Sequence, residues 1–152
     1  MLIVDDDIGS CLVMQRMVQR LGLDCDIVYD GQQAIRAVSG KRYSVIFLDS
    51  FMPIQNGWET ALEIQGLSLS STENPILIGM VSFDQHSLRK KWETAGIEIL
   101  LSKPINRIDL AAIINIAVAD SLHWLPQSIM NISNASTCNS SSISGQSKYL
   151  LS

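Results

Sequence analysis

Short apolar runs alternate along this chain with longer segments in which apolar residues recur every three or four positions. A short apolar run between turn residues is typical of a buried strand, and the longer period is typical of a helix with one buried side. We therefore predict strands at Leu2–Val4, Asp24–Tyr29, Ser44–Leu48, Ile76–Val81 and Glu98–Leu101. Helices are predicted at Ile8–Leu21, Gln32–Val38, Trp58–Gly66 and Gln85–Ala95, with a last helix from Asn106 to about Ser121.

This pattern places one helix after each strand, five times, with short connections. Such regular alternation predicts a parallel sheet with helices on both faces, joined by right-handed crossovers. We therefore predict an α/β fold of the flavodoxin-like kind: a (βα)5 doubly wound parallel sheet with strand order 2-1-3-4-5.

The composition changes after Trp124 and Pro126, where Ser and Asn become dominant and large apolar residues become rare. Such a segment cannot bury enough apolar surface to offset the entropy lost on ordering. We therefore predict one folded domain at residues 1–121, followed by a disordered Ser/Asn-rich tail at residues 122–152.

Composition and charge exclude several classes of function. The chain has 152 residues, of which 47% are hydrophobic and 17% charged, as expected for one globular domain. Its net charge of −4 argues against a nucleic-acid partner, and no apolar run approaches the ~18 residues of a membrane span. Cys11, Cys25 and Cys138 form neither a CxxC motif nor an even set, which suits a reducing compartment. We expect a cytoplasmic location, or a nuclear one if the organism is a eukaryote.

Charged residues stand at the carboxyl ends of three predicted strands. Asp5 and Asp6 follow the first strand, Asp49 the third and Lys103 the fifth. Because the first and third strands are neighbours in the predicted order, the three acids share one crevice. Three close carboxylates raise one another's pKa, and a hard divalent cation such as Mg²⁺ would compensate for this. Asp49 could then attack phosphorus and hold the group as an acyl phosphate, with Lys103 as a second counter-charge and Ser82 as a further donor.

Each of these residues also has an ordinary structural interpretation. A pair of Asp residues before a helix is usually an N-cap, a lone Asp after a strand is usually a turn residue, and Lys-Pro can simply end a strand. Their joint placement in one crevice, in a fold predicted independently of them, favours a functional site.

Four segments together resemble the receiver domain of two-component response regulators, over residues 1 to about 121. They are Leu2-Ile3-Val4-Asp5-Asp6-Asp7, Phe47-Leu48-Asp49-Ser50-Phe51-Met52-Pro53 with Gly57, Ala95-Gly96, and Leu101-Ser102-Lys103-Pro104-Ile105. The resemblance implies that Asp49 accepts a phosphoryl group from a phosphohistidine on a histidine kinase or a histidine phosphotransfer protein. Mg²⁺ would be held by Asp5, Asp6, the Asp49 carboxylate and the backbone carbonyl of Phe51, and Lys103 would pair with the phosphoryl group.

The resemblance further implies a signalling role. Such a domain is not an enzyme in its own right, although it assists its own phosphorylation and dephosphorylation. Phosphorylation would switch a protein-interaction surface, and the downstream target is not identifiable from the sequence. The peptide bond before Pro104 is often cis in this family.

Two positions depart from the family pattern. Counting back from Ala95-Gly96 places the family's Ser/Thr at the end of the fourth strand on Val81, and only a loop one residue shorter places it on Ser82. Three residues before Lys103 the family often has a rotating Tyr or Phe, whereas this chain has Leu100. These departures keep open an alternative: a degenerate receiver that acts as a phosphate-independent protein-interaction module.

Two other classes of protein fit less well. An aspartate-nucleophile phosphohydrolase would need an acid two residues after Asp49, where this chain has Phe51. A flavodoxin would need a first loop rich in Ser, Thr and Gly, whereas Asp5-Asp6-Asp7 would repel a phosphate group. Trp58, Trp92 and Trp124 are interpreted as packing residues.

Overall fold

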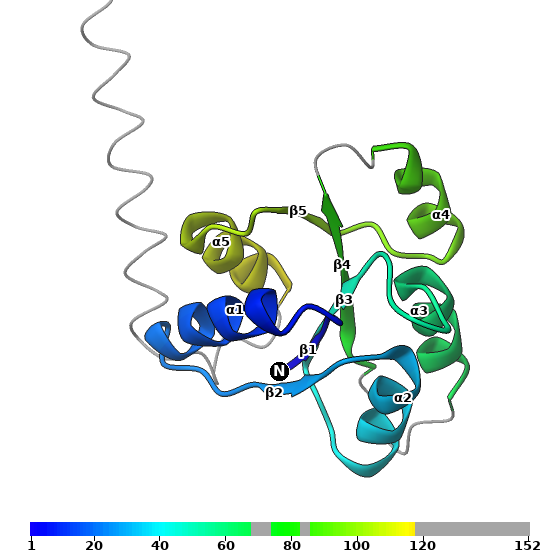
Figure 1. The fold of residues 1–152 in the computed structure, drawn as a ribbon, viewed down its shortest axis with the longest axis horizontal. Helices are drawn as coiled ribbons and strands as arrows, with labels where there is room; N and C mark the ends of the chain where they lie inside the picture. Colours follow the sequence, from blue (N-terminus) through cyan, green and yellow to red (C-terminus); the bar gives the residue numbers. More distant parts are fainter. Residues whose placement is uncertain (68–73, 83–85, 118–152) are drawn as a thin grey trace, which may run out of the picture.

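Five parallel strands form one sheet in the order β2-β1-β3-β4-β5, with helices on both sides (Figure 1). The computed structural model describes residues 1–67, 74–82 and 86–117, so the predicted tail lies outside the described residues. The strands are β1 (Leu2–Val4), β2 (Asp26–Val28), β3 (Val45–Asp49), β4 (Ile76–Ser82) and β5 (Leu100–Lys103). The helices are α1 (Ile8–Arg20), α2 (Gly31–Gly40), α3 (Gly57–Gly66), the 3-10 turn η1 (His86–Leu88), α4 (Arg89–Thr94) and α5 (Arg107–Ala117). No helix within these ranges is long and apolar enough to cross a membrane.

The sheet separates two apolar layers, because successive strand residues point to opposite faces. Helices α1 and α5 cover one face, and α2, α3 and α4 cover the other (Figure 1). All five residues of β3 are buried, as expected for the central strand of a sheet covered on both faces. The first layer contains strand residues Ile3, Phe47, Met80 and Leu101, and the second contains Val4, Leu48 and Val81.

The predicted fold class and strand order are confirmed, and several predicted boundaries are wrong. The fifth strand runs from Leu100 to Lys103, not from Glu98 to Leu101. The reason is a tight turn after α4, in which Gly96 takes a φ of 73° and the Ile97 N–H donates to the Trp92 carbonyl. The ladder with β4 then pairs Gly79 with Leu100 first, so that Lys103 lies within the strand.

Other boundaries also differ from the prediction. The predicted helix at 85–95 is a 3-10 turn over His86–Leu88 followed by a short α4 at Arg89–Thr94, since only part of that segment closes full helical hydrogen bonds. The fourth strand continues one residue beyond its predicted end and includes Ser82, which pairs with Lys103.

Candidate functional site

The charged residues converge because they share one face of the pleated sheet. Asp5, Asp49 and Lys103 each lie two residues beyond a strand residue that is buried under α1 and α5. Since side chains alternate between faces, two residues further on is the same face. The Asp5 N–H donates to the Val28 carbonyl at 3.2 Å, which continues the ladder of β1 up to Asp5. The buried strand residues two positions before Asp5, Asp49 and Lys103 are Ile3, Phe47 and Leu101, respectively.

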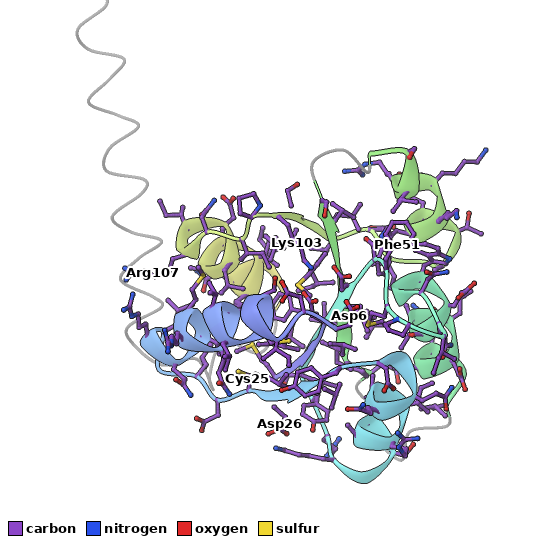
Figure 2. The ribbon with its side chains drawn as sticks, viewed as in Figure 1. Asp6, Cys25, Asp26, Phe51, Lys103 and Arg107 are labelled. Atoms are coloured by element: carbon purple, nitrogen blue, oxygen red, sulfur yellow. The ribbon has the colours of Figure 1, made fainter. Side chains whose placement is uncertain are left out.

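The three carboxylates and the lysine form one compact cluster. One oxygen each from Asp5, Asp6 and Asp49 lies within 4.8 Å of the others. Lys103 Nζ lies 2.6 Å from Asp5 Oδ2 and 2.5 Å from Asp49 Oδ1. Figure 2 shows Asp6, Lys103 and Phe51 near one another at this edge of the sheet. The residues predicted as acidic ligands and counter-charge are therefore brought together.

The acidic run after β1 divides into three local roles. Asp5 is buried, and its Oδ1 accepts the Asp7 N–H at 2.9 Å. Asp6 is exposed at the mouth of the cluster. Asp7 caps α1, since its side chain accepts the Gly9 N–H at 3.0 Å and the Ser10 hydroxyl at 2.8 Å. The N-cap of α1 is therefore Asp7, whereas Asp5 and Asp6, the pair for which a capping role was the alternative, belong to the cluster.

Burial and the ion pair shift the pKa values of both Asp49 and Lys103. Burial raises the pKa of Asp49, although the ion pair with Lys103 opposes this, and the Asp5 carboxylate adds to the rise. Burial alone would lower the pKa of Lys103, but its bonds to Asp49 and Asp5 outweigh burial and raise that pKa. A cationic Lys103 therefore faces two carboxylates, of which Asp49 carries its charge at a cost.

The donor set fits a hard divalent cation. All three side chains offer carboxylate oxygens, which Mg²⁺ prefers, and their spacing allows one ion to contact all of them directly or through water. No sulfur or imidazole ligand takes part in this cluster within the described part of the chain. The raised pKa of Asp49 is consistent with a carboxylate that gains from an added positive charge.

The sheet register places Ser82, and not Val81, on the face of the cluster. Val81 is buried in the layer under α3 and α4, with 6% of its surface exposed. Ser82 lies two residues beyond Met80, which packs under α1 and α5, and it pairs with Lys103 in the ladder. The hydroxyl-bearing residue is therefore beside Lys103, while Val81 is directed to the opposite face.

The loop after β3 contributes contacts that the sequence did not reveal. The Phe51 N–H donates to Asp49 Oδ2 at 3.2 Å, and the buried Ser50 hydroxyl donates to the Met80 carbonyl at 2.6 Å. Gly57 lies so close that a Cβ there would be 2.0 Å from the Asp49 carbonyl oxygen. The only sequence signal for this close approach was the Asn56-Gly57 turn. The Lys103–Pro104 peptide bond is cis, as the resemblance implies.

Comparisons with known proteins agree on one family. The model of the response regulator receiver domain matches residues 1–115. The two-component response regulator 24 of Arabidopsis thaliana is 27% identical over 115 residues, which are 75% of this chain and 80% of that protein. The sensor protein EvgS of Escherichia coli K12 is 32% identical over 104 residues, or 68% of this chain, but these make up only 8% of its own length.

The solved structures include a receiver domain of similar shape. It belongs to the sensor histidine kinase PA1611 of Pseudomonas aeruginosa PAO1 and has a magnesium ion coordinated in its active-site cleft. It is 27% identical, with a TM-score of 0.70, over 78% of this chain and 95% of that one. Because the family model spans most of the chain and the carboxylates and lysine meet at one edge of the sheet, the chain belongs to the response regulator receiver domain family.

Proposed function

We propose that Asp49 of this receiver domain accepts a phosphoryl group from a phosphohistidine and thereby switches a protein-interaction surface. The observation that carries this proposal is the position of Asp49. Asp49 is 9% exposed and belongs to a cluster of three carboxylates. Its side chain contacts the Lys103 ammonium group, which also contacts Asp5. At this position Lys103, together with a bound Mg²⁺, would offset the charge of an anionic group.

The reaction would be a displacement at phosphorus. An Asp49 oxygen forms the new O–P bond, the P–N bond of the phosphohistidine breaks, and the imidazole keeps the electron pair and takes a proton from water. Bound Mg²⁺ would supply positive charge for the phosphoryl oxygens, held by Asp5, Asp6, Asp49 and the backbone carbonyl of Phe51. Lys103 would exchange its contact with the Asp49 carboxylate for one with the transferred group.

Ser82 would complete the set of phosphoryl contacts. It is half-buried, is paired with Lys103 in the ladder, and is on the same face as Asp49. A hydroxyl there can donate to a phosphoryl oxygen, which an aliphatic Val81 side chain on the far face cannot do. The hydroxyl position therefore supports an intact site.

The rim of the site supports a protein as phosphodonor. Ile8 and Leu12 in the first turns of α1 are 59% and 46% exposed, Phe51 is 47% exposed, and Ile108 at the start of α5 is 72% exposed. Exposed apolar side chains around a polar site are typical of a protein-binding surface. A histidine kinase or a histidine phosphotransfer protein would cover this rim while presenting its phosphohistidine to Asp49.

The alternative, a receiver that acts without phosphate, is not favoured. It rested on Val81 as the fourth-strand position and on Leu100. The register directs Val81 away from the site and puts Ser82 beside Lys103. An interaction module that never binds phosphate has no use for a cluster of three carboxylates in which burial works against the charge of Asp49.

The test is labelling by small phosphodonors. Wild-type protein with Mg²⁺ and acetyl phosphate is expected to gain the mass of one phosphoryl group, stable in acid and lost in base. Phosphoramidate, whose P–N bond resembles that of phosphohistidine, is expected to label as well. Asp49→Asn should remove the gain. Asp109→Asn, a change of the same kind at an exposed residue of α5, should keep it.

The outcomes separate the two functions. Absence of labelling in wild type, under conditions that label a control receiver domain, would refute the phosphoacceptor proposal and favour the phosphate-independent module. Labelling that persists in Asp49→Asn would show that another residue accepts the group.

A further inference from the structure

A row of three aromatic rings runs from the lip of the site into the core beneath α4. The Phe51 and Trp58 ring centroids are 5.6 Å apart at an interplanar angle of 83°, and those of Trp58 and Trp92 are 6.0 Å apart at 86°. Edge-to-face geometry of this kind is favourable for aromatic pairs. Exposure falls along the row, from 47% at Phe51 to 8% at Trp58 and 0% at Trp92. The row thus links the loop after β3, α3 and α4.

The outer end of the row is attached to Asp49. The Phe51 N–H donates to Asp49 Oδ2, so the peptide that carries the first ring is held by the carboxylate itself. A change in what this carboxylate binds must therefore either keep or break that hydrogen bond. Loss of that hydrogen bond would release the peptide that positions the Phe51 ring.

The inner end of the row packs against the backbone of α3 and β4. A Cβ at Gly57 would lie 2.7 Å from Trp92 Cη2, and one at Gly79 would lie 2.9 Å from Cδ2 and Cε2 of the same indole. The indole therefore rests on two glycines, one in α3 and one in β4. Its Nε1 is buried and has no hydrogen-bond partner among the described residues, so packing alone sets its position.

A lysine of α4 lies over the middle ring of the row. Lys91 of α4 lies with Nζ 4.6 Å from the centre of the Trp58 ring, which is a cation–π distance. Helix α4 is thus held to the middle of the row by Lys91 and to its inner end by Trp92. A shift of the Trp58 ring would act on the same helix through both residues.

Leu100 stands three residues before Lys103, where the family often has an aromatic residue, and it cannot link the site to α4 through an aromatic ring. Leu100 is half-buried and packs with the layer that contains Trp92. Its Cδ2 would lie 2.7 Å from a Cβ at Gly79, so it fills the space beside the indole. An aliphatic side chain in that place has no aromatic ring that could rotate toward the site.

We propose that the row Phe51–Trp58–Trp92 couples the state of Asp49 to the position of α4. This inference rests on the proposed function. When a metal ion and a phosphoryl group bind at Asp49, the Phe51 peptide is repositioned, its ring shifts on Trp58, and the two α4 residues Lys91 and Trp92 follow. The surface that changes on phosphorylation is then η1 and α4.

The experiment observes the two tryptophans directly. Trp124 is replaced by Phe in every protein, and 5-fluorotryptophan gives one fluorine resonance each for Trp58 and Trp92. Mg²⁺ with beryllofluoride, a stable analogue of the phosphoryl group, is expected to move both resonances. Acetyl phosphate labelling of the same protein, followed by mass, reports independently whether Asp49 accepts phosphate.

Variants at the middle of the row decide the mechanism. Trp58→Phe keeps an aromatic ring, so the Trp92 resonance should still respond. Trp58→Leu keeps an apolar side chain but has no aromatic face, and the response should fall to less than half of that in Trp58→Phe. Leu62→Ala, on the same helix at a half-exposed position outside the row, is the matched control and should leave the response unchanged.

Three results would overturn the inference. One is an equal Trp92 response in Trp58→Leu and Trp58→Phe. Another is a Trp92 resonance that does not move in the protein with both Trp58 and Trp92, although Asp49 is labelled. This result does not depend on the folding of any Trp58 variant, and it would leave the proposed function intact. Failure of Asp49 to label at all would remove both proposals.

Discussion

Gly57→Ala is the substitution whose cost the structure defines most directly. A methyl group at this first residue of α3 would lie 2.0 Å from the Asp49 carbonyl oxygen and 2.7 Å from Trp92 Cη2. One obstacle is backbone of the central strand and the other is a fully buried ring, so neither can move aside without cost. The change therefore tests whether α3 packs against the peptide that carries Asp49.

The expected magnitude follows from overpacking. Extra methyl groups in a well-packed interior typically cost about 1–3 kcal/mol, and the backbone obstacle places Gly57→Ala at about 3 kcal/mol. At the other end of the same helix, a methyl group added at Gly66 would meet no neighbouring atom within 4 Å. Gly66→Ala should stabilise the protein by about 0.4–1 kcal/mol, because it restricts the unfolded chain.

Urea denaturation followed by circular dichroism measures both changes. With unchanged slopes, the midpoint should fall for Gly57→Ala and rise slightly for Gly66→Ala. In thermal melts the corresponding shifts are a decrease of about 10 °C and an increase of a few degrees. A loss below about 1 kcal/mol for Gly57→Ala, or a similar effect of both substitutions, would contradict the close packing of α3 on Asp49.

Three further predictions concern the charged cluster. Burial raises the pKa of Asp49, so its carboxylate destabilises the metal-free fold at neutral pH. Asp49→Asn should therefore have a higher melting temperature than wild type in EDTA at pH 7. This difference in melting temperature should shrink as pH falls through the raised pKa toward the ordinary value of about 3.9. A difference that grows on acidification would contradict this sign. Lys103→Met leaves two buried carboxylates without their shared cation and should lose about 3 kcal/mol in urea denaturation with EDTA. Millimolar Mg²⁺ should recover part of that loss, and equal losses with and without Mg²⁺ would argue against a metal at the cluster. Ser82→Ala should slow labelling by acetyl phosphate several-fold, whereas Val81→Ala should lower the melting temperature without slowing labelling; the reverse pattern would place Val81 at the site.

Several features of this protein follow from the sequence because they depend only on local periodicity. The alternation of short apolar runs with helical periods is enough for a doubly wound parallel sheet, since few topologies satisfy right-handed crossovers. The same reasoning places Asp5, Asp49 and Lys103 at one edge, because carboxyl ends of parallel strands coincide. Their separation along the chain was therefore no obstacle to predicting one cluster.

The choice between Val81 and Ser82 could not be made from the sequence. It depends on the register of β4 against β5, and one residue of slip moves every side chain to the other face. Counting through the connection to Ala95-Gly96 required an assumed loop length, and that assumption favoured the wrong residue for the face of the cluster. The pairing of Ser82 with Lys103 puts Ser82 on the same face of the sheet as the lysine.

The sequence by itself determined the fold class, the strand order and the edge at which the acids and the lysine gather. These follow from the alternation of strands and helices along the chain and from the rules for connecting parallel strands. Only the tertiary structure decided which of Val81 and Ser82 lies on the face of the cluster and how closely Gly57 approaches Asp49. It alone also revealed that the rings of residues 51, 58 and 92 form one row. Each of these depends on how the side chains of different elements meet across a few ångströms, a distance that no local pattern specifies.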